Sequence, residues 1–176
     1  MVQFVPWGQG DEDAFNKLQA GKADFYLGDK VFARTDRGKV ELFDLLKVDE
    51  KRGRLYIVHV KKGFSAKMRD VCSQLRLTAD VISADILNGK SMLEIYYDEW
   101  HSEGHAGSVT RAAFLSWFDY EIVYVILCST PNEFVADDFQ QHRLTSHIAR
   151  REIMSIKNEM KIRGREFRLA HTRYSG

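Results

Sequence analysis

The chain has 176 residues, of which 44% are hydrophobic and 12% aromatic, and its formal net charge is +1. This composition is sufficient for a packed core, so it excludes a disordered chain and a collagen-like chain. The longest apolar run, at 122–128, is far shorter than the ~20 residues that a membrane-spanning helix requires. The two cysteines form neither a disulfide framework nor a CxxC pair. We therefore expect one domain over residues 1–176 in a reducing, cytoplasmic setting, with no membrane partner.

Positive charge is concentrated in two segments of this nearly neutral chain. Residues 47–76 contain nine Lys and Arg against three Asp and Glu, and residues 143–176 contain the same numbers. Such segments suit a surface that meets a polyanion, and two solvated faces with ion pairs along a helix explain them equally well. The candidate nucleic-acid-binding residues are Lys62, Lys67, Arg150, Arg151, Lys157 and Lys161.

Hydrophobic periodicity, caps and turn residues predict an alternation of helices and strands. The expected elements are, in chain order, a helix at 11–20, strands at 29–35, 39–46 and 54–62, helices beginning at 65 and at 78, the second ending at 87, a strand at 93–97, a helix at 109–118, a strand at 121–128, a helix from 145 or 146 to 163, and a strand at 166–172. This order predicts an α/β (or α+β) fold with a central mixed sheet flanked by helices. The region 90–118 is a candidate insertion or lid.

Chemically useful side chains gather on the predicted hairpin of the second and third strands. Because side chains alternate between faces along a strand, His59 and Lys61 share one face of the third strand. The expected pairing brings Asp44 of the second strand to that face, although a slip of one residue would remove it. Metal-dependent phosphodiester cleavage uses these residue types: a carboxylate that holds Mg²⁺, a second ligand about a strand away, and a Lys that orients the attacking water. A solvated strand face with a cross-strand Asp–Lys pair worth at most ~1 kcal/mol is the alternative.

This arrangement resembles the restriction-endonuclease-like superfamily, which has an α-β-β-β-α-β core with an acid on one strand and Asp/Glu-x-Lys on the next. The resemblance implies that Asp44 is the first acid and that His59-Val60-Lys61 takes the place of the second motif. The preceding helix offers Glu12 and the following helix offers Gln74. The implied metal ligands are Glu12, Glu41 and Asp44, and the implied catalytic residues are Asp44, His59, Lys61 and Gln74.

The departure from the superfamily pattern lies at His59, which stands where an acid is expected. Imidazole suits Zn²⁺ or Mn²⁺ better than Mg²⁺. Either Glu12 or Glu41 supplies the missing carboxylate, or the site binds its ligand without cleaving it. In the catalytic interpretation Lys61 positions the nucleophile, and Gln74 orients Lys61 or the substrate.

Four stretches also resemble the domain-of-unknown-function 6119 family, a group of sporadically distributed bacterial proteins. They are 12–16, 40–46, 57–61 with the helix at 65–74, and the closing helix, Gly164 and strand. The resemblance implies a bacterial or phage-related cytoplasmic protein from mobile-element or phage-defence neighbourhoods. It implies no particular activity.

Residues 98–107 form a polar, glycine-containing link that offers two further candidates. His101, Glu103 and His105 could form a divalent-metal loop, and a mobile polar loop is the alternative. Trp100 in this link is a candidate for base stacking. The sequence contains no GxGxxG, Walker loop or G-x-S-x-G motif, which argues against a nucleotide cofactor and an α/β-hydrolase.

The sequence thus favours a metal-dependent nuclease-like domain that hydrolyses or binds nucleic-acid phosphodiesters in a bacterial or phage-defence setting. The expected cofactor is a divalent metal, Mg²⁺ or Mn²⁺, and the expected partner is nucleic acid, with a homo-oligomer or a larger defence assembly also compatible. A non-catalytic nucleic-acid- or partner-binding module of a defence or toxin system is the first alternative. A structural protein-interaction domain is the second.

Overall fold

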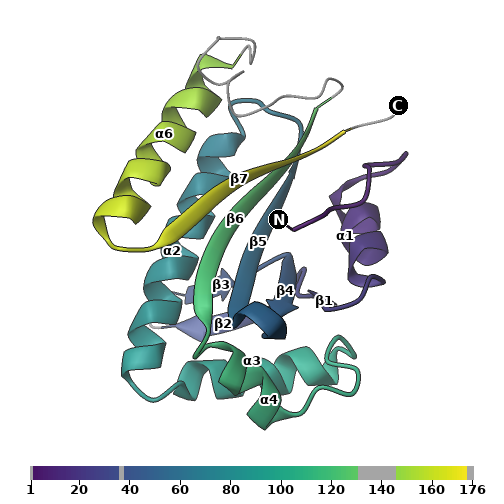
Figure 1. Ribbon diagram of the computed structural model, residues 1–176, viewed down its shortest axis with the longest axis vertical. Helices are drawn as coiled ribbons and strands as arrows, with labels where there is room; N and C mark the ends of the chain where they lie inside the picture. Colours follow the sequence, from purple (N-terminus) through teal and green to yellow (C-terminus); the bar gives the residue numbers. More distant parts are fainter. Residues whose placement is uncertain (1, 36–37, 131–145, 174–176) are drawn as a thin grey trace.

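The computed structural model describes residues 2–35, 38–130 and 146–173. Its helices and strands follow one another along the chain as labelled in Figure 1. They are α1 (Glu12–Ala20), β1 (Phe25–Leu27), β2 (Phe32–Thr35), β3 (Gly38–Glu41), β4 (Leu45–Asp49), the 3-10 helix η1 (Glu50–Arg52), β5 (Arg54–Lys62), α2 (Met68–Leu87), α3 (Ser91–Ser102), α4 (Arg111–Trp117), β6 (Glu121–Thr130), α6 (His147–Ile162) and β7 (Glu166–Arg173). Over the described residues no helix combines the length and the apolar character needed to cross a membrane.

The central sheet has five strands in the order β1-β4-β5-β6-β7. β4 pairs antiparallel with β1 and with β5, whereas β6 is parallel to both β5 and β7. The predicted hairpin register is confirmed, because Leu45 lies opposite Val58 and Leu46 opposite Ile57. Helix α1, strands β1, β4 and β5, helix α2 and strand β6 follow one another in an α-β-β-β-α-β order, but its first strand is β1 and not the run predicted at 29–35. The β2–β3 pair and the helices α3 and α4 are inserted into this order, and α6 and β7 are added after it.

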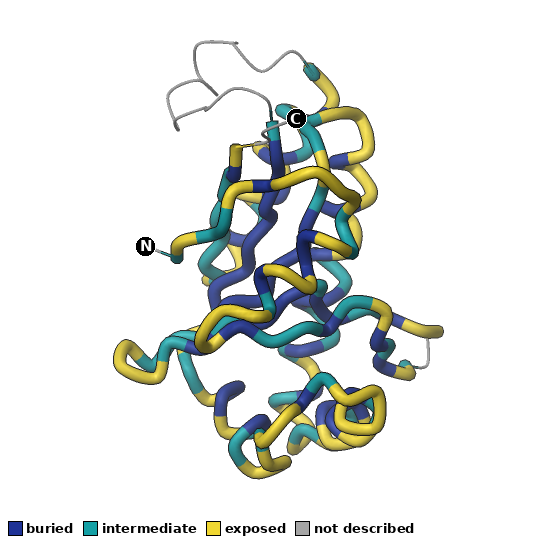
Figure 2. The backbone as a smooth tube through the Cα atoms, turned by 90° about the vertical axis from the view of Figure 1, so that its right-hand side faces the viewer, coloured by how far each residue is buried: buried dark blue, intermediate teal, exposed yellow. Residues whose placement is uncertain are grey.

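Helices cover both faces of the sheet, and the central strands are buried between them (Figures 1 and 2). The larger core packs α2 and α6 against one face, where Ile57 and Ile126 point, and it continues into α3 and α4 at one end of the sheet (Figure 1). The smaller core packs α1 and the N-terminal segment against the other face, where Val58 and Val125 point. The apolar strand predicted at 121–128 is therefore buried on both faces, as a central strand of an α/β sheet should be.

The strands predicted before the hairpin needed correction. The run predicted at 29–35 is β2, which pairs only with β3 in a separate two-stranded sheet. The strand predicted at 39–46 breaks into β3 and β4, because Leu42 and Phe43 both enter the larger core and a continuous strand would point them to opposite faces. The edge strand next to β4 in the central sheet is instead the short strand β1.

Two expectations for the helices were also wrong. Thr78 does not begin a second helix, because α2 runs without a break from Met68 to Leu87. The Thr78 hydroxyl does not cap a helix and instead donates to the backbone carbonyl of Glu41. Residues 93–97 are helical rather than extended, and α3 buries Leu93, Tyr96, Tyr97 and Trp100 at helical spacing. Trp100 has no exposed surface and its indole N–H donates to the Leu27 carbonyl, so it does not offer a face for base stacking.

Candidate functional site

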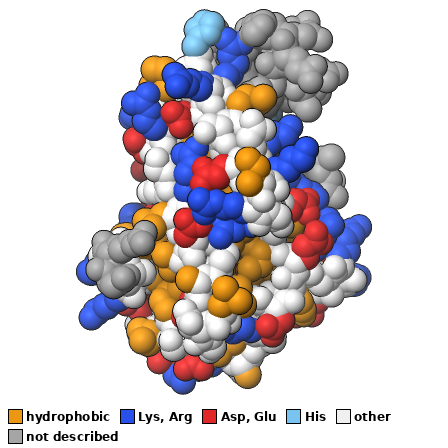
Figure 3. All heavy atoms as spheres, turned by 90° about the vertical axis from the view of Figure 1, so that its left-hand side faces the viewer, with side chains coloured by type: hydrophobic (Ala, Val, Ile, Leu, Met, Phe, Trp, Pro, Cys, Tyr) orange, Lys and Arg blue, Asp and Glu red, His pale blue; other side chains and the backbone are white. Residues whose placement is uncertain are grey.

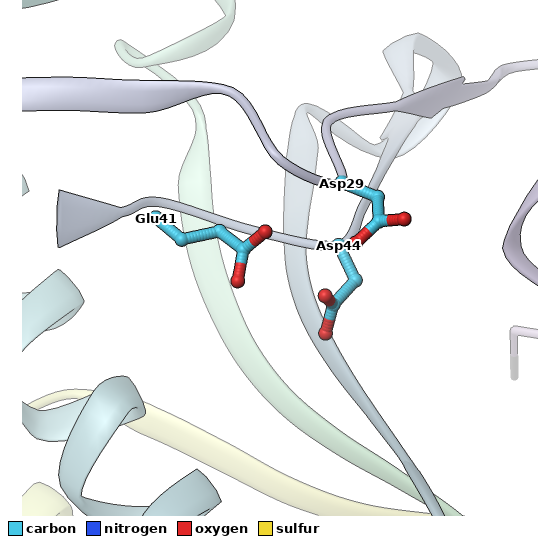
Figure 4. A group of neighbouring side chains, drawn as sticks. All are labelled: Asp29, Glu41 and Asp44. Atoms are coloured by element: carbon cyan, nitrogen blue, oxygen red, sulfur yellow. The ribbon is translucent and has the colours of Figure 1, made fainter. Parts of the chain in front are cut away.

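Three carboxylates meet where the chain passes between β3 and β4 (Figure 4). Ligand oxygens of Asp29, Glu41 and Asp44 all lie within 4.8 Å of one another. Asp29 reaches this group because Gly28 donates its N–H to the Asp44 carbonyl over 2.9 Å. A β-carbon on Gly28 would lie 2.2 Å from the Phe43 ring, so only glycine permits this approach. We call Asp29, Glu41 and Asp44 the carboxylate triad.

Asp44 and Asp29 of the carboxylate triad each keep only 15% of the side chain exposed. Asp44 has a hydrogen bond to the central sheet. Its Oδ2 accepts a hydrogen bond of 2.6 Å from the N–H of Val60 on β5. Burial, with a smaller contribution from the charge of Glu41, raises the pKa of Asp44 to about 8, and the hydrogen bond from Val60 opposes both effects. Near neutral pH this carboxyl therefore holds its proton unless a cation compensates for the charge.

The other two members of the carboxylate triad, Glu41 and Asp29, both interact with Lys30. Glu41 accepts the N–H of Lys30 over 2.7 Å, and the Lys30 ammonium lies 3.7 Å from Asp29. Burial raises the pKa of Glu41 and is also the main cause of the raised pKa of Asp29. All three acids of the carboxylate triad are thus shifted toward the protonated state. Oxygen ligands in this arrangement are those that Mg²⁺, Mn²⁺ and Ca²⁺ use in proteins.

His59 lies beside the carboxylate triad and is almost fully buried, since only 1% of its surface is exposed. Its Nε2 is 3.2 Å from the Thr78 hydroxyl of α2, and its Nδ1 is 3.7 Å from Asp44 Oδ2. Nδ1 has no hydrogen-bond partner. Burial lowers the pKa of His59 to about 4, so the imidazole is neutral at physiological pH. The sequence prediction that Asp44 and His59 lie together is confirmed.

Lys61 follows His59 at the end of β5, and its ammonium is paired with Glu12 of α1. The distances from Nζ to the two Glu12 carboxylate oxygens are 2.9 and 3.0 Å. Glu12 also accepts the backbone N–H of Lys62 over 2.9 Å, so it joins the start of α1 to the end of β5. Glu12 stands outside the carboxylate triad, although its charge contributes to raising the pKa of Asp44. Glu41 and Asp44 are therefore the two predicted metal ligands that the structure brings together.

The remaining predicted residues are dispersed. Gln74 is exposed on α2, one turn before Thr78. Lys67, Arg151, Lys157 and Lys161 are also exposed, whereas the Lys62 ammonium donates to the Gly10 carbonyl and Arg150 donates to the ring of His147.

Many basic side chains of the two positive segments form ion pairs with acids. Arg76 of α2 lies 2.8 Å from Glu159 of α6, and Arg69 lies 3.6 Å from Glu152. On the face that carries α6, Lys and Arg are interspersed with Asp and Glu and with hydrophobic side chains (Figure 3). Ion pairs across the helices therefore account for part of the uneven charge distribution.

The link at 98–107 does not form a second acidic or histidine-rich group. Trp100, His101 and Ser102 belong to α3, and His101 packs its ring 5.7 Å from that of Tyr97. Within the described residues, the carboxylate triad is the group of His, Cys, Asp and Glu side chains whose ligand atoms are close enough to hold an ion together.

Two residues of the site were not found from the sequence. Asp29 begins a run that resembles a strand, although Gly28-Asp29 directly after the apolar Phe25–Leu27 is a turn signal that could have separated them. Tyr96 of α3 is fully buried, and its hydroxyl has no hydrogen-bond partner. Burial raises its pKa, as do the charges of Glu41 and Asp44, so this hydroxyl lies within the electrostatic reach of the carboxylate triad.

Comparison with protein-family models, with curated proteins and with solved structures finds no match for this chain. Function is therefore argued from the chemistry of the carboxylate triad and the residues around it.

Proposed function

We propose that this protein is a metal-dependent nuclease-like enzyme that hydrolyses nucleic-acid phosphodiesters. The observation that carries the proposal is the meeting of the carboxylate triad with the buried His59 of β5. It occurs within an α-β-β-β-α-β order of elements, which is the setting in which the superfamily that the sequence resembles uses such residues. The resemblance to the domain-of-unknown-function 6119 family supports a bacterial, phage-defence setting in the cytoplasm.

The chain's own residues supply charge and positioning. The carboxylate triad provides oxygen ligands for one divalent ion, Mg²⁺ or Mn²⁺, and Asp44 is fixed in direction by the Val60 N–H. Such an ion polarises a phosphate and lowers the pKa of a bound water. Lys61 brings a positive charge to the same end of β5, and Glu12 holds that ammonium in place. In this proposal the ammonium orients the attacking water or stabilises charge that develops on the phosphate.

Cleavage of labelled single- and double-stranded DNA and RNA in Mg²⁺ or Mn²⁺ tests the proposal. We expect Lys61→Ala and Asp44→Asn each to lower the rate by about 100-fold or more, a typical effect of losing a positioned catalytic group. The matched controls are Lys51→Ala and Glu50→Gln, which change the same charges in η1 at the opposite end of β5. Cleavage that is equal in the wild type and in Lys61→Ala and Asp44→Asn would refute the enzymatic proposal.

The engagement of the Lys61 ammonium by Glu12 favours one further candidate, a module that binds nucleic acid without cleaving it. In that case the protein would show an affinity for nucleic acid that falls with salt, and no turnover on any of the four substrates. The Lys61→Ala variant would then change the affinity rather than a rate.

A further inference from the structure

Hydrogen bonding around His59 determines which of its nitrogens carries the proton. The Thr78 hydroxyl has a single hydrogen, and it donates that hydrogen to the Glu41 carbonyl at 3.2 Å. Both hydrogen bonds of this hydroxyl form at once only when its oxygen accepts from His59, which makes Nε2, at 3.2 Å, the protonated nitrogen. Nδ1 is left as a bare lone pair. The backbone of Glu41, a member of the carboxylate triad, thereby sets the tautomer of the neighbouring imidazole.

The bare Nδ1 faces an acid rather than a donor. It lies 3.7 Å from Asp44 Oδ2, and no group of the described residues donates a hydrogen bond to it. Burying an unpaired imidazole nitrogen costs about 1–3 kcal/mol, and at 3.7 Å the protonated Asp44 carboxyl is too far away to donate to it. A cation between the two atoms would give Nδ1 a partner and would take the place of the proton that Asp44 holds. A histidine that ligates a metal through one nitrogen usually donates the other N–H to a fixed acceptor, which is the part that Thr78 plays.

The separation of the two atoms fits a shared ion. Two ligands that each lie about 2.1 Å from one ion stand roughly 3.0–3.4 Å apart at angles of 90–110°. The observed 3.7 Å is a few tenths of an ångström wider than this range. Asp44 links the imidazole to the rest of the carboxylate triad, because its oxygens also lie within 4.8 Å of ligand oxygens of Asp29 and Glu41.

We propose that His59 Nδ1 is a metal ligand, and that it makes this site selective for a first-row transition ion such as Mn²⁺ over Mg²⁺. The inference rests on the metal site of the proposed function and adds a nitrogen ligand to it. Mg²⁺ takes oxygen ligands almost entirely, whereas imidazole suits transition ions.

Binding of Mn²⁺ to the purified protein tests the inference without any substrate. In pulsed electron paramagnetic resonance, a coordinated imidazole adds a nitrogen coupling to the Mn²⁺ signal. We expect this coupling in the wild type and in His101→Gln, and its loss in His59→Gln. By calorimetry, we expect His59→Gln to lower Mn²⁺ affinity by at least about tenfold while leaving the weaker Mg²⁺ affinity within about threefold, since second-sphere losses alone reach 10- to 100-fold.

Thr78 provides a second variant that leaves the imidazole in place. Thr78→Val removes the acceptor that fixes the tautomer, and we expect about a tenfold loss of Mn²⁺ affinity. Thr78→Ser keeps the hydroxyl and should restore the affinity. Circular dichroism of each variant confirms that it is folded.

The outcomes separate the inference from the proposed function. Mn²⁺ bound without a nitrogen coupling, or no Mn²⁺ bound at millimolar concentration, would overturn the inference even if the protein cleaves nucleic acid. A nitrogen coupling that disappears in His59→Gln would support it even if none of the four substrates is cleaved.

Discussion

Replacing Asp44 with asparagine should remove a large pH dependence from the stability of the metal-free protein. Burial raises the pKa of Asp44 from 3.8 to about 8 in the folded state. The folded state therefore retains a proton that the unfolded state has already released between these two pH values. Stability falls as the pH rises wherever the folded state binds more protons, so this carboxyl destabilises the protein progressively from about pH 4 to about pH 8.

His59 has the opposite effect, which defines the useful pH window. Burial lowers its pKa from 6.5 to about 4, so below pH 6.5 the unfolded state binds the extra proton and stability rises with pH. The contributions of His59 and Asp44 oppose each other between about pH 4 and 6.5. Above pH 6.5 the opposing contribution of His59 ends, and Asp44 alone should cost the wild type about 2 kcal/mol between pH 6.5 and 8, at up to about 1.36 kcal/mol per pH unit.

Urea unfolding at pH 6.5, 7.25 and 8 in the presence of a chelator measures this loss, with fluorescence of the buried Trp7, Trp100 and Trp117 as the signal. We expect Asp44→Asn to be nearly flat across the window, and the control Glu50→Gln in η1 to follow the wild type. Addition of Mn²⁺ should raise the stability of the wild type at pH 8 and should leave the stability of Asp44→Asn unchanged. Parallel pH profiles for the wild type and Asp44→Asn would show that the buried carboxyl is not the source of the pH dependence, and would refute the reasoning.

Three further predictions address the surroundings of the site. Gly28→Ala should destabilise the protein by about 3 kcal/mol in urea unfolding because its β-carbon would overlap neighbouring atoms, whereas Gly8→Ala, with nothing within 4 Å, should be near neutral. Tyr96→Phe removes a buried hydroxyl without a partner and should be neutral or stabilising, whereas Tyr97→Phe loses a 2.7 Å hydrogen bond and should cost about 1 kcal/mol by the same assay. If α6 contacts duplex DNA, Lys157→Gln should reduce the slope of log affinity against log salt by about 0.9 in a fluorescence titration, and an unchanged slope would remove it from the interface.

The hairpin that carries His59 and Lys61 could be predicted from the sequence because local signals determine it. The polar turn at 49–53 separates two apolar runs, and Gly53 takes the positive φ of 58° that closes the turn. The length of this turn then sets the register, with Asp49 opposite Arg54. The proximity of Asp44 to His59 follows from that register.

The rest of the site depends on contacts between residues far apart in the chain. The break before Asp44 arises because both Leu42 and Phe43 enter the larger core, and the arrival of Asp29 depends on the contact of Gly28 with Phe43. No local pattern encodes either event. Tyr96 was assigned to a strand because a five-residue apolar pattern does not distinguish a strand from a buried helix turn.

Unpaired polar atoms in the interior identify the same region as the carboxylates do. Among the described residues, the buried side-chain atoms without a hydrogen-bond partner are the amide oxygen of Asn16, Nδ1 of His59 and the hydroxyl of Tyr96. Two of the three adjoin the carboxylate triad, from β5 on one side and from α3 on the other. Each unpaired atom and each buried acid lowers the stability of the metal-free fold, so a sequence selected only for stability would not place them together. A divalent ion would compensate the buried charge of the acids and would give the imidazole nitrogen a partner. This double effect is the strongest physical reason to propose a metal site in the region.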